Sequence, residues 1–153
     1  MTDTLCSGHY NHSSEHFINP PLHRTGYQDT SEEDLIPEDI KSHLIDLYFE
    51  WDQPWFQVVN ERLFRDSLAY QGRYCSSLLL NCILAVGSRY CDRLEIRSDP
   101  NDPNTAGKIF IQRAENLIQR DLRWPKITTI QSLAIMGVYY IVRMANLPPS
   151  FVH

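Results

Sequence analysis

Residues 76–91 read Ser-Ser-Leu-Leu-Leu-Asn-Cys-Ile-Leu-Ala-Val-Gly-Ser-Arg-Tyr-Cys, and this stretch decides the fold class. Successive side chains on an α-helix are about 100° apart, so its six large aliphatic residues cover nearly the whole circumference. Such a helix is either a membrane span or the centre of a helical core. The apolar run is about half of the roughly 20 residues that a span needs, and Asn81 interrupts it. We therefore predict a buried core helix that other helices must cover.

A second stretch, 129–144, is also apolar on nearly every side. The capping box Thr128-x-x-Gln131 is predicted to open it, and the helix is expected to be too short to cross a bilayer. Two such helices are expected to pack against each other. The predicted fold is therefore all-α, with about five helices packed around the helices 76–91 and 129–144.

Three amphipathic helices are predicted to supply the cover. The first begins at Pro37 and has one apolar face, formed by Ile40, Leu44, Leu47, Tyr48 and Trp51. The second follows Asn60 as its N-cap and directs three apolar side chains inward: Leu63, Phe64 and Leu68. The third begins at Asp102-Pro103 and ends near Leu122. In the central helix, Gly87 is expected to permit a close helix crossing.

Length and charge limit the functional classes. The 153 residues are 42% hydrophobic and 22% charged, which is ordinary for one soluble domain. We expect a disordered polar tail over 1–34, a helical domain over 35–145 and an unstructured tail over 146–153. Residues 1–52 hold 11 acidic and 2 basic side chains, and the remainder holds 8 acidic and 12 basic ones without any basic run. This distribution does not favour direct binding to nucleic-acid phosphates, and no membrane contact is predicted.

Metal sites and catalytic motifs were sought by spacing. Cys6-x2-His9-x2-His12-x3-His16 offers soft zinc ligands but lies in the predicted tail, so no metal site is assigned. Cys82 is expected to be a reduced thiol that packs in the core. There is no phosphate-binding glycine loop, nucleophile elbow or His-Glu-x-x-His pair, and His43 has no identifiable acid-base partner. No enzymatic activity and no cofactor are predicted.

An aromatic cluster is the one candidate site in the sequence. Trp51, Trp55, Phe56 and Tyr90 could line a small-molecule pocket, although aromatic residues at helical spacing more commonly form core. A small-molecule-binding helical domain is therefore one alternative for the function of this chain. A fragment without function is the other.

Three blocks of the sequence follow one another at a characteristic spacing. The first contains Leu47-Tyr48-Phe49, Pro54-Trp55-Phe56 and Phe64, and the second runs from Ser77 to Tyr90. The third contains Phe110, Arg113-Ala114 and Leu117, then the run from Ile127 to Leu133, and Gly137. Together these blocks resemble the middle homology region of fungal zinc-cluster transcription factors, over about residues 36–144. Gln57 and Asn60 stand where that family often has Pro and His.

The resemblance implies a nuclear regulatory domain that controls transcription through an effector, a co-regulator or another copy of itself. The family reads DNA through a six-cysteine binuclear zinc cluster, whose Cys-x2-Cys-x6-Cys pattern is missing here. Contact with DNA is therefore expected only through a separate segment, and no zinc ligand is assigned. The family's domain continues beyond the equivalent of Met144, so a truncated domain is expected.

The expected truncation would have a physical consequence. Helices that are apolar on all sides need partners on all sides, and five helices are too few to cover both of them. We therefore expect an exposed apolar patch that makes the isolated chain self-associate or pack loosely.

Overall fold

The structure is a computed structural model that describes residues 36–145. Within that range it contains five α-helices and no β-strand, with a single antiparallel bridge between Arg97 and Ala106. The predicted all-α class is confirmed. Both predicted tails, 1–34 and 146–153, lie outside the described residues. The same is true of the cluster formed by Cys6, His9, His12 and His16.

The central helix α3, Ser77–Gly87, forms where the sequence predicts it. The Ser76 hydroxyl accepts a hydrogen bond from the Leu79 backbone N–H at 3.2 Å, which caps the helix. Every residue from Leu78 to Gly87 is buried, and the chain continues into a 3-10 turn, Ser88–Tyr90. A core helix buried on all sides is therefore confirmed.

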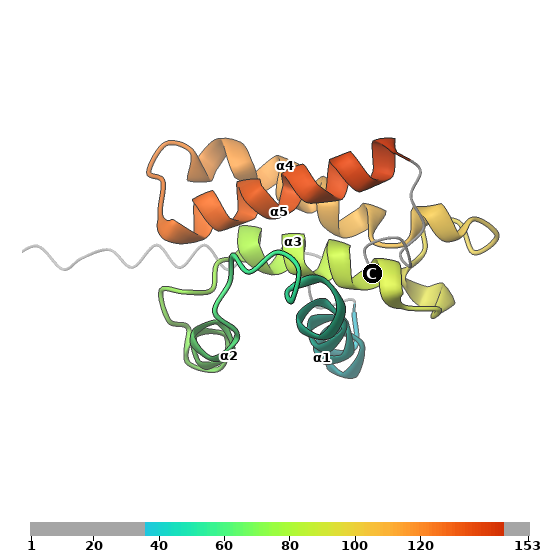
Figure 1. Cartoon of the computed structure of the whole chain (residues 1–153), viewed down its shortest axis with the longest axis horizontal. Helices are drawn as coiled ribbons and strands as arrows, with labels where there is room; N and C mark the ends of the chain where they lie inside the picture. The colour runs from blue at the N-terminus through green and yellow to red at the C-terminus, as the bar shows by residue number, and fades with distance from the viewer. Residues whose placement is uncertain (1–35, 146–153) are drawn as a thin grey trace, which may run out of the picture. The chain divides into compact units, whose positions relative to one another are not determined.

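The other helices lie on two sides of α3. Figure 1 shows α4, Lys108–Asp121, and α5, Ile127–Met144, together on one side, with α1, Glu38–Leu47, and α2, Glu61–Tyr70, on the other. Helices α1, α4 and α5 all contact α3 directly, so the predicted packing of the two apolar helices is confirmed. The core is formed by their buried side chains, among them Leu44, Phe64, Leu79, Ile83, Phe110 and Ile135.

Two glycines permit the closest approaches to α3. A Cβ atom on Gly87 would lie 2.1 Å from the Leu44 carbonyl oxygen, so α3 crosses α1 at a distance that only glycine allows. Gly107 precedes α4 with a left-handed φ of 74°, and its Cβ would lie 2.5 Å from the Ala85 carbonyl oxygen. The close crossing expected at Gly87 is confirmed.

Helix α1 buries most of the face that was predicted, with Trp51 as the exception. It continues into a π-helical turn, Tyr48–Asp52, and its buried side chains are Ile40, Leu44, Ile45, Tyr48, Phe49 and Asp52. Trp51 is 39% exposed, so its predicted place on the inner face is wrong. The rings of Phe49 and Phe64 lie 5.8 Å apart, and this contact with α2 draws the buried face toward Phe49.

Helix α2 confirms its predicted cap, and two of its three predicted inner residues, Phe64 and Leu68, face the core. The Asn60 side chain accepts a hydrogen bond from the Leu63 backbone N–H at 3.0 Å. Phe64 is buried, whereas Leu63 is 41% exposed. The predicted inward placement of Leu63 is wrong, because α2 packs against the core along one narrow side only, and Phe64 and Ser67 occupy that side.

The starts of α4 and α5 are displaced from their predicted positions. Asp102 caps a 3-10 turn, Pro103–Thr105, by accepting from the Asn104 backbone N–H at 2.9 Å, and α4 begins only after Gly107. At α5 the Thr129 hydroxyl accepts from the Lys126 backbone N–H at 3.0 Å. The predicted Thr128–Gln131 capping box is therefore wrong. Thr129 bonds the backbone N–H of Lys126 instead, and the Gln131 side chain donates to the Val58 carbonyl oxygen.

Helix α5 is less buried than predicted. It has 18 residues and is the one helix in the described range that is long and apolar enough to cross a membrane, so the expectation that it is too short to do so is wrong. Only 39% of it is buried within the protein. Ile130 is 62% exposed, Ile141 67% and Met144 86%, so burial on nearly every side is wrong for this helix. One face packs on α3 and α4 and the opposite face is uncovered. A helix of a soluble core meets the same length and composition criterion, so this finding alone does not indicate a span.

Candidate functional site

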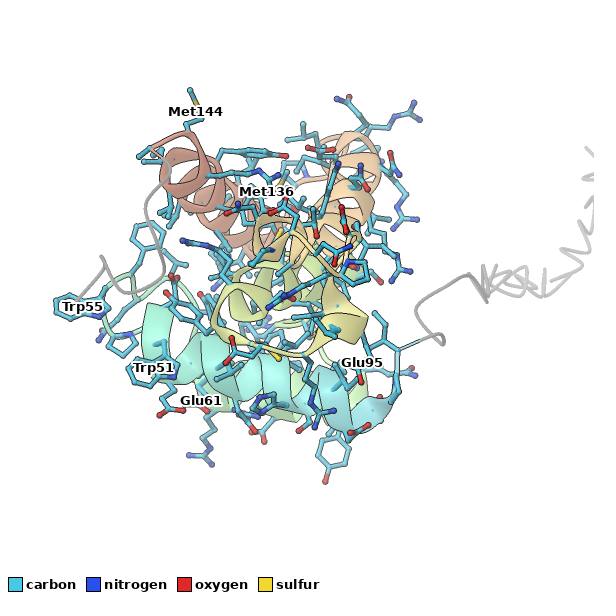
Figure 2. All side chains as sticks on the ribbon, turned by 90° about the vertical axis from the view of Figure 1, so that its right-hand side faces the viewer. Trp51, Trp55, Glu61, Glu95, Met136 and Met144 are labelled. Atoms are coloured by element: carbon cyan, nitrogen blue, oxygen red, sulfur yellow. The ribbon has the colours of Figure 1, made fainter. Side chains whose placement is uncertain are left out.

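Three of the four predicted pocket residues lie on the segment that ends α1. Trp51 is 39% exposed, Trp55 61% and Phe56 36%, and Figure 2 shows Trp55 pointing away from the helices. The backbone N–H groups of Trp55 and Phe56 donate to the Asp52 carbonyl oxygen at 3.1 and 3.2 Å, which forms a turn. The three aromatic residues thus lie in the π-helical turn or directly after it.

The fourth residue, Tyr90, reaches this turn through its hydroxyl group. Tyr90 is half-buried, and its hydroxyl donates to a carboxylate oxygen of Asp52 at 3.4 Å. Burial and the nearby Asp52 carboxylate together raise the pKa of Tyr90 to about 12, although the positive charge of Arg89 opposes the increase. Tyr90 is therefore linked to the segment of Trp51 by a polar contact.

Asp52 is the centre of a polar cluster that sequence reasoning missed. Its side chain is only 3% exposed. Burial raises its pKa above the ordinary range, although the positive charge of Arg89 and the hydrogen bond from Tyr90 act in the opposite direction. The signal in the sequence was that Asp52 is four residues after Tyr48, which places the two side chains on the same side of the helix.

Tyr48 completes the cluster from inside the core. Its side chain is fully buried, and burial together with the Asp52 charge raises the pKa of its hydroxyl. Within the described residues that hydroxyl has no hydrogen-bond partner. A buried hydroxyl without a partner is a position where a ligand atom or a water molecule gains a hydrogen bond.

A second candidate site is the uncovered face of α5. Its exposed large side chains are Ile127, Ile130, Leu133, Ile141 and Met144. Figure 2 shows Met144 projecting outward at the end of the helix. No charged residue occurs from Ile127 to Val142. A continuous apolar helix face of this kind is typical of an interaction surface.

The described residues show little that suggests enzymatic chemistry. Over residues 36–145 no group of three or more His, Cys, Asp or Glu side chains is placed to hold a metal ion. His43 is exposed on α1. The geometry defines a helical domain with a buried polar cluster and one apolar helix face. It also has a group of aromatic residues that we call the aromatic rim: Trp51, Trp55, Phe56 and Tyr90. These are features of a binding or regulatory domain.

Comparison with known proteins identifies the family. Residues 45–146 match the profile described as "Fungal specific transcription factor domain", which covers well over half of the chain. The chain therefore belongs to this family, and the resemblance seen in its three sequence blocks is confirmed. It is a regulatory domain of the fungal zinc-cluster type.

Three relatives show the closeness of the match. The chain is 41% identical over 101 residues to the nitrogen assimilation transcription factor nirA of Emericella nidulans, covering 63% of this chain and 11% of the relative. It is 38% identical over 106 residues to nit-4 of Neurospora crassa, a nitrogen assimilation transcription factor, covering 63% and 10%. It is 30% identical over 106 residues to cutinase transcription factor 1 alpha of Fusarium vanettenii, covering 69% and 12%.

These relatives are transcription factors, not enzymes, and the chain spans about a tenth of their length. No solved structure matches the chain.

Proposed function

We propose that this chain acts as a regulatory module of a fungal transcription factor and works in the nucleus. In this proposal it controls transcription by contacting an effector, a co-regulator or another copy of itself, while a different segment contacts DNA. The family match over residues 45–146 carries the proposal. The apolar face of α5 and the aromatic rim supply surfaces for such contacts.

A chimera tests this role. Residues 45–146 would replace the matched 101-residue segment of the Emericella nidulans relative, in a strain that lacks its own copy. Because that relative is named for nitrogen assimilation, transcription of its targets would be compared on different nitrogen sources. We expect transcription that still responds to the nitrogen source.

The matched control is the same chimera carrying Leu79→Asp, which puts a charge into the fully buried centre of α3. This variant should lose the response. An unregulated chimera that accumulates to the normal level in the nucleus would contradict the proposed role.

A second candidate function is small-molecule binding at the aromatic rim. The specific observation in its favour is the unpartnered Tyr48 hydroxyl beside buried Asp52, close to the segment that carries Trp51 and Trp55. In this proposal Trp51, Trp55, Phe56 and Tyr90 form the walls of the site, and the polar cluster selects a ligand with a hydrogen-bonding group.

Tryptophan fluorescence tests the pocket. A panel of metabolites would be titrated into the protein, and a true ligand should give a saturable change that Trp51→Phe or Trp55→Phe reduces. Trp124→Phe is the matched control, because Trp124 is 83% exposed between α4 and α5. If no metabolite gives a saturable change, the pocket is not a binding site for that class of compound.

A further inference from the structure

The uncovered face of α5 has the spacing of a coiled-coil seam. Its centre line is Ile127, Ile130, Ala134, Gly137, Ile141 and Met144, whose positions alternate in steps of three and four. This is the a/d pattern by which one helix packs along another. We call these six residues the α5 stripe. Leu133, which is 44% exposed, and Val138 flank it on either side.

The middle of the stripe is open to close approach. Gly137 is exposed, and a Cβ atom added to it would meet nothing within 4 Å. Ala134 is the other small residue, one turn earlier. Small residues in the middle of a helix face let a second helix come near, and the large side chains at the two ends then pack around it.

The order of sizes along the stripe is the same in both directions. Read from either end it is large, large, small, small, large, large, so an antiparallel copy places Ile130 opposite Ile141 and Ala134 opposite Gly137. A surface that complements itself when turned by 180° suits a two-fold dimer, in which one patch meets its own copy.

The charge pattern agrees with this occupant, and the area limits how tightly it can bind. Because no charged side chain occurs from Ile127 to Val142, the middle of the stripe brings no like charges together in a pair of copies, and a charged partner finds nothing to pair with there. The stripe is about 27 Å long and about 10 Å wide, so each copy contributes roughly 300 Å². The pair would bury about 600 Å², which is less than the roughly 1,200 Å² of stable complexes and indicates a weak dimer.

We infer that this chain forms a weak antiparallel homodimer through the α5 stripe. The antiparallel direction also brings the positive end of each helix dipole to the negative end of the other. The inference deepens the proposed function by naming the self contact and its surface. It can fail while the regulatory role holds, because it is measured by association and not by transcription.

Sedimentation of the full chain over about 1 μM to 1 mM tests the dimer, because weak complexes dissociate within this range. We expect the 17.9 kDa monomer at the low end and increasing dimer at the high end. Ile130→Glu and Ile141→Lys should each prevent dimerisation without unfolding, since both side chains are mostly exposed. The matched control is Ile109→Glu, on an isoleucine of α4 that is 40% exposed and outside the stripe, which should dimerise normally.

An equal mixture of the Ile130→Glu and Ile141→Lys variants tests the direction. In an antiparallel pair the introduced Glu faces the introduced Lys, so the mixture should dimerise at low salt although neither variant does alone. In a parallel pair the two charges never meet. Circular dichroism melts of each variant would verify that the fold is retained.

Cysteine cross-linking provides a second measurement that detects weak dimers. The Ile130→Cys and Ile141→Cys variants, each with Cys6 and Cys75 replaced by Ser, should form a disulfide only when mixed. In the antiparallel pair two copies of residue 130 are about 16 Å apart along the helices, too far for a disulfide.

Several outcomes would overturn the inference. They are a monomer at every concentration with no cross-link, a dimer that survives Ile130→Glu, or cross-linking within each single variant. Binding of the chain to phosphatidylcholine vesicles, abolished by Ile130→Glu, would instead assign the stripe to a membrane surface.

Discussion

Gly87 is the residue on which the contact between α1 and α3 depends. Its missing side chain leaves room for the Leu44 carbonyl oxygen, which a Cβ atom would approach to 2.1 Å. We expect Gly87→Ala to lower the free energy of unfolding by about 2 kcal/mol, because α1 must move away from the core. Chemical denaturation measures the change.

Gly137→Ala is the matched control for this prediction. It also lies within an apolar helix, but a Cβ atom there meets nothing within 4 Å. It should therefore raise the free energy of unfolding by up to about 1 kcal/mol through helix propensity alone. Equal effects at the two glycines would show that the close approach at Gly87 does not constrain the packing.

Asp52 should make stability depend on pH. Its pKa in the folded protein is raised by burial, so the folded state holds the proton more tightly than the unfolded state does. Below the unfolded-state pKa of about 3.9, Asp52 is protonated in both states and the stability of the protein is fully retained. The protein loses stability as the pH rises through the pKa of Asp52 in the folded state. Asp52→Asn should therefore raise the melting temperature at pH 7, by an amount that shrinks toward pH 4.

Melting curves between pH 4 and pH 7 measure this difference. Asp66→Asn, on the exposed side of α2, is the control and should show little dependence. A constant difference between Asp52→Asn and the wild type at all pH values would contradict the assignment.

At the scale of elements, Gln131 joins α5 to the segment before α2. Its side-chain amide donates to the Val58 carbonyl oxygen at 2.7 Å, and the neighbouring Val59 carbonyl accepts from Gln53 at 2.9 Å. Gln131→Ala should cost about 1 kcal/mol and leave the segment less protected. Hydrogen exchange of residues 53–60 measures the effect, and Gln119→Ala, exposed on α4, should leave that exchange unchanged.

The elements also show where periodicity is informative. The order of the helices was predicted, as was the cap at Asn60, because a cap depends on residues three apart. The cap at Ser76 was not predicted. The inner faces of α1 and α2 were predicted incorrectly at Trp51 and Leu63. Apolar residues occur on more than one side of these helices, and only the position of the neighbouring helix selects which side is buried.

At the scale of the whole molecule, Cys82 reports on the integrity of the core. It is fully buried in α3, and burial raises the pKa of its thiol to about 12. In a variant with Cys6 and Cys75 replaced by Ser, we expect maleimide to label Cys82 only as fast as the protein unfolds. Mass spectrometry measures the rate, and Gly87→Ala should accelerate it. Rapid labelling under native conditions would indicate the loosely packed state that the sequence also allowed.

Only part of the candidate site could be predicted from the sequence. Trp51, Trp55, Phe56 and Tyr90 were selected for their chemistry, and their role as a pocket stays a prediction. Asp52 and Tyr48 were missed as a polar cluster, because the contact between Asp52 and Tyr90 joins residues 38 positions apart. The domain limits 35–145 also stay a prediction, since the tails lie outside the described residues.

The sequence by itself determined the all-α class, the helix order, the two apolar helices and the family. Those properties follow from local periodicity, capping and the order of motifs along the chain. The burial of α3 on all sides was predicted as well, and only the tertiary structure decided that α5 instead exposes a stripe. The two helices are similarly apolar, and the difference arises because α3 has neighbours on both sides whereas the described helices cover α5 on one side only.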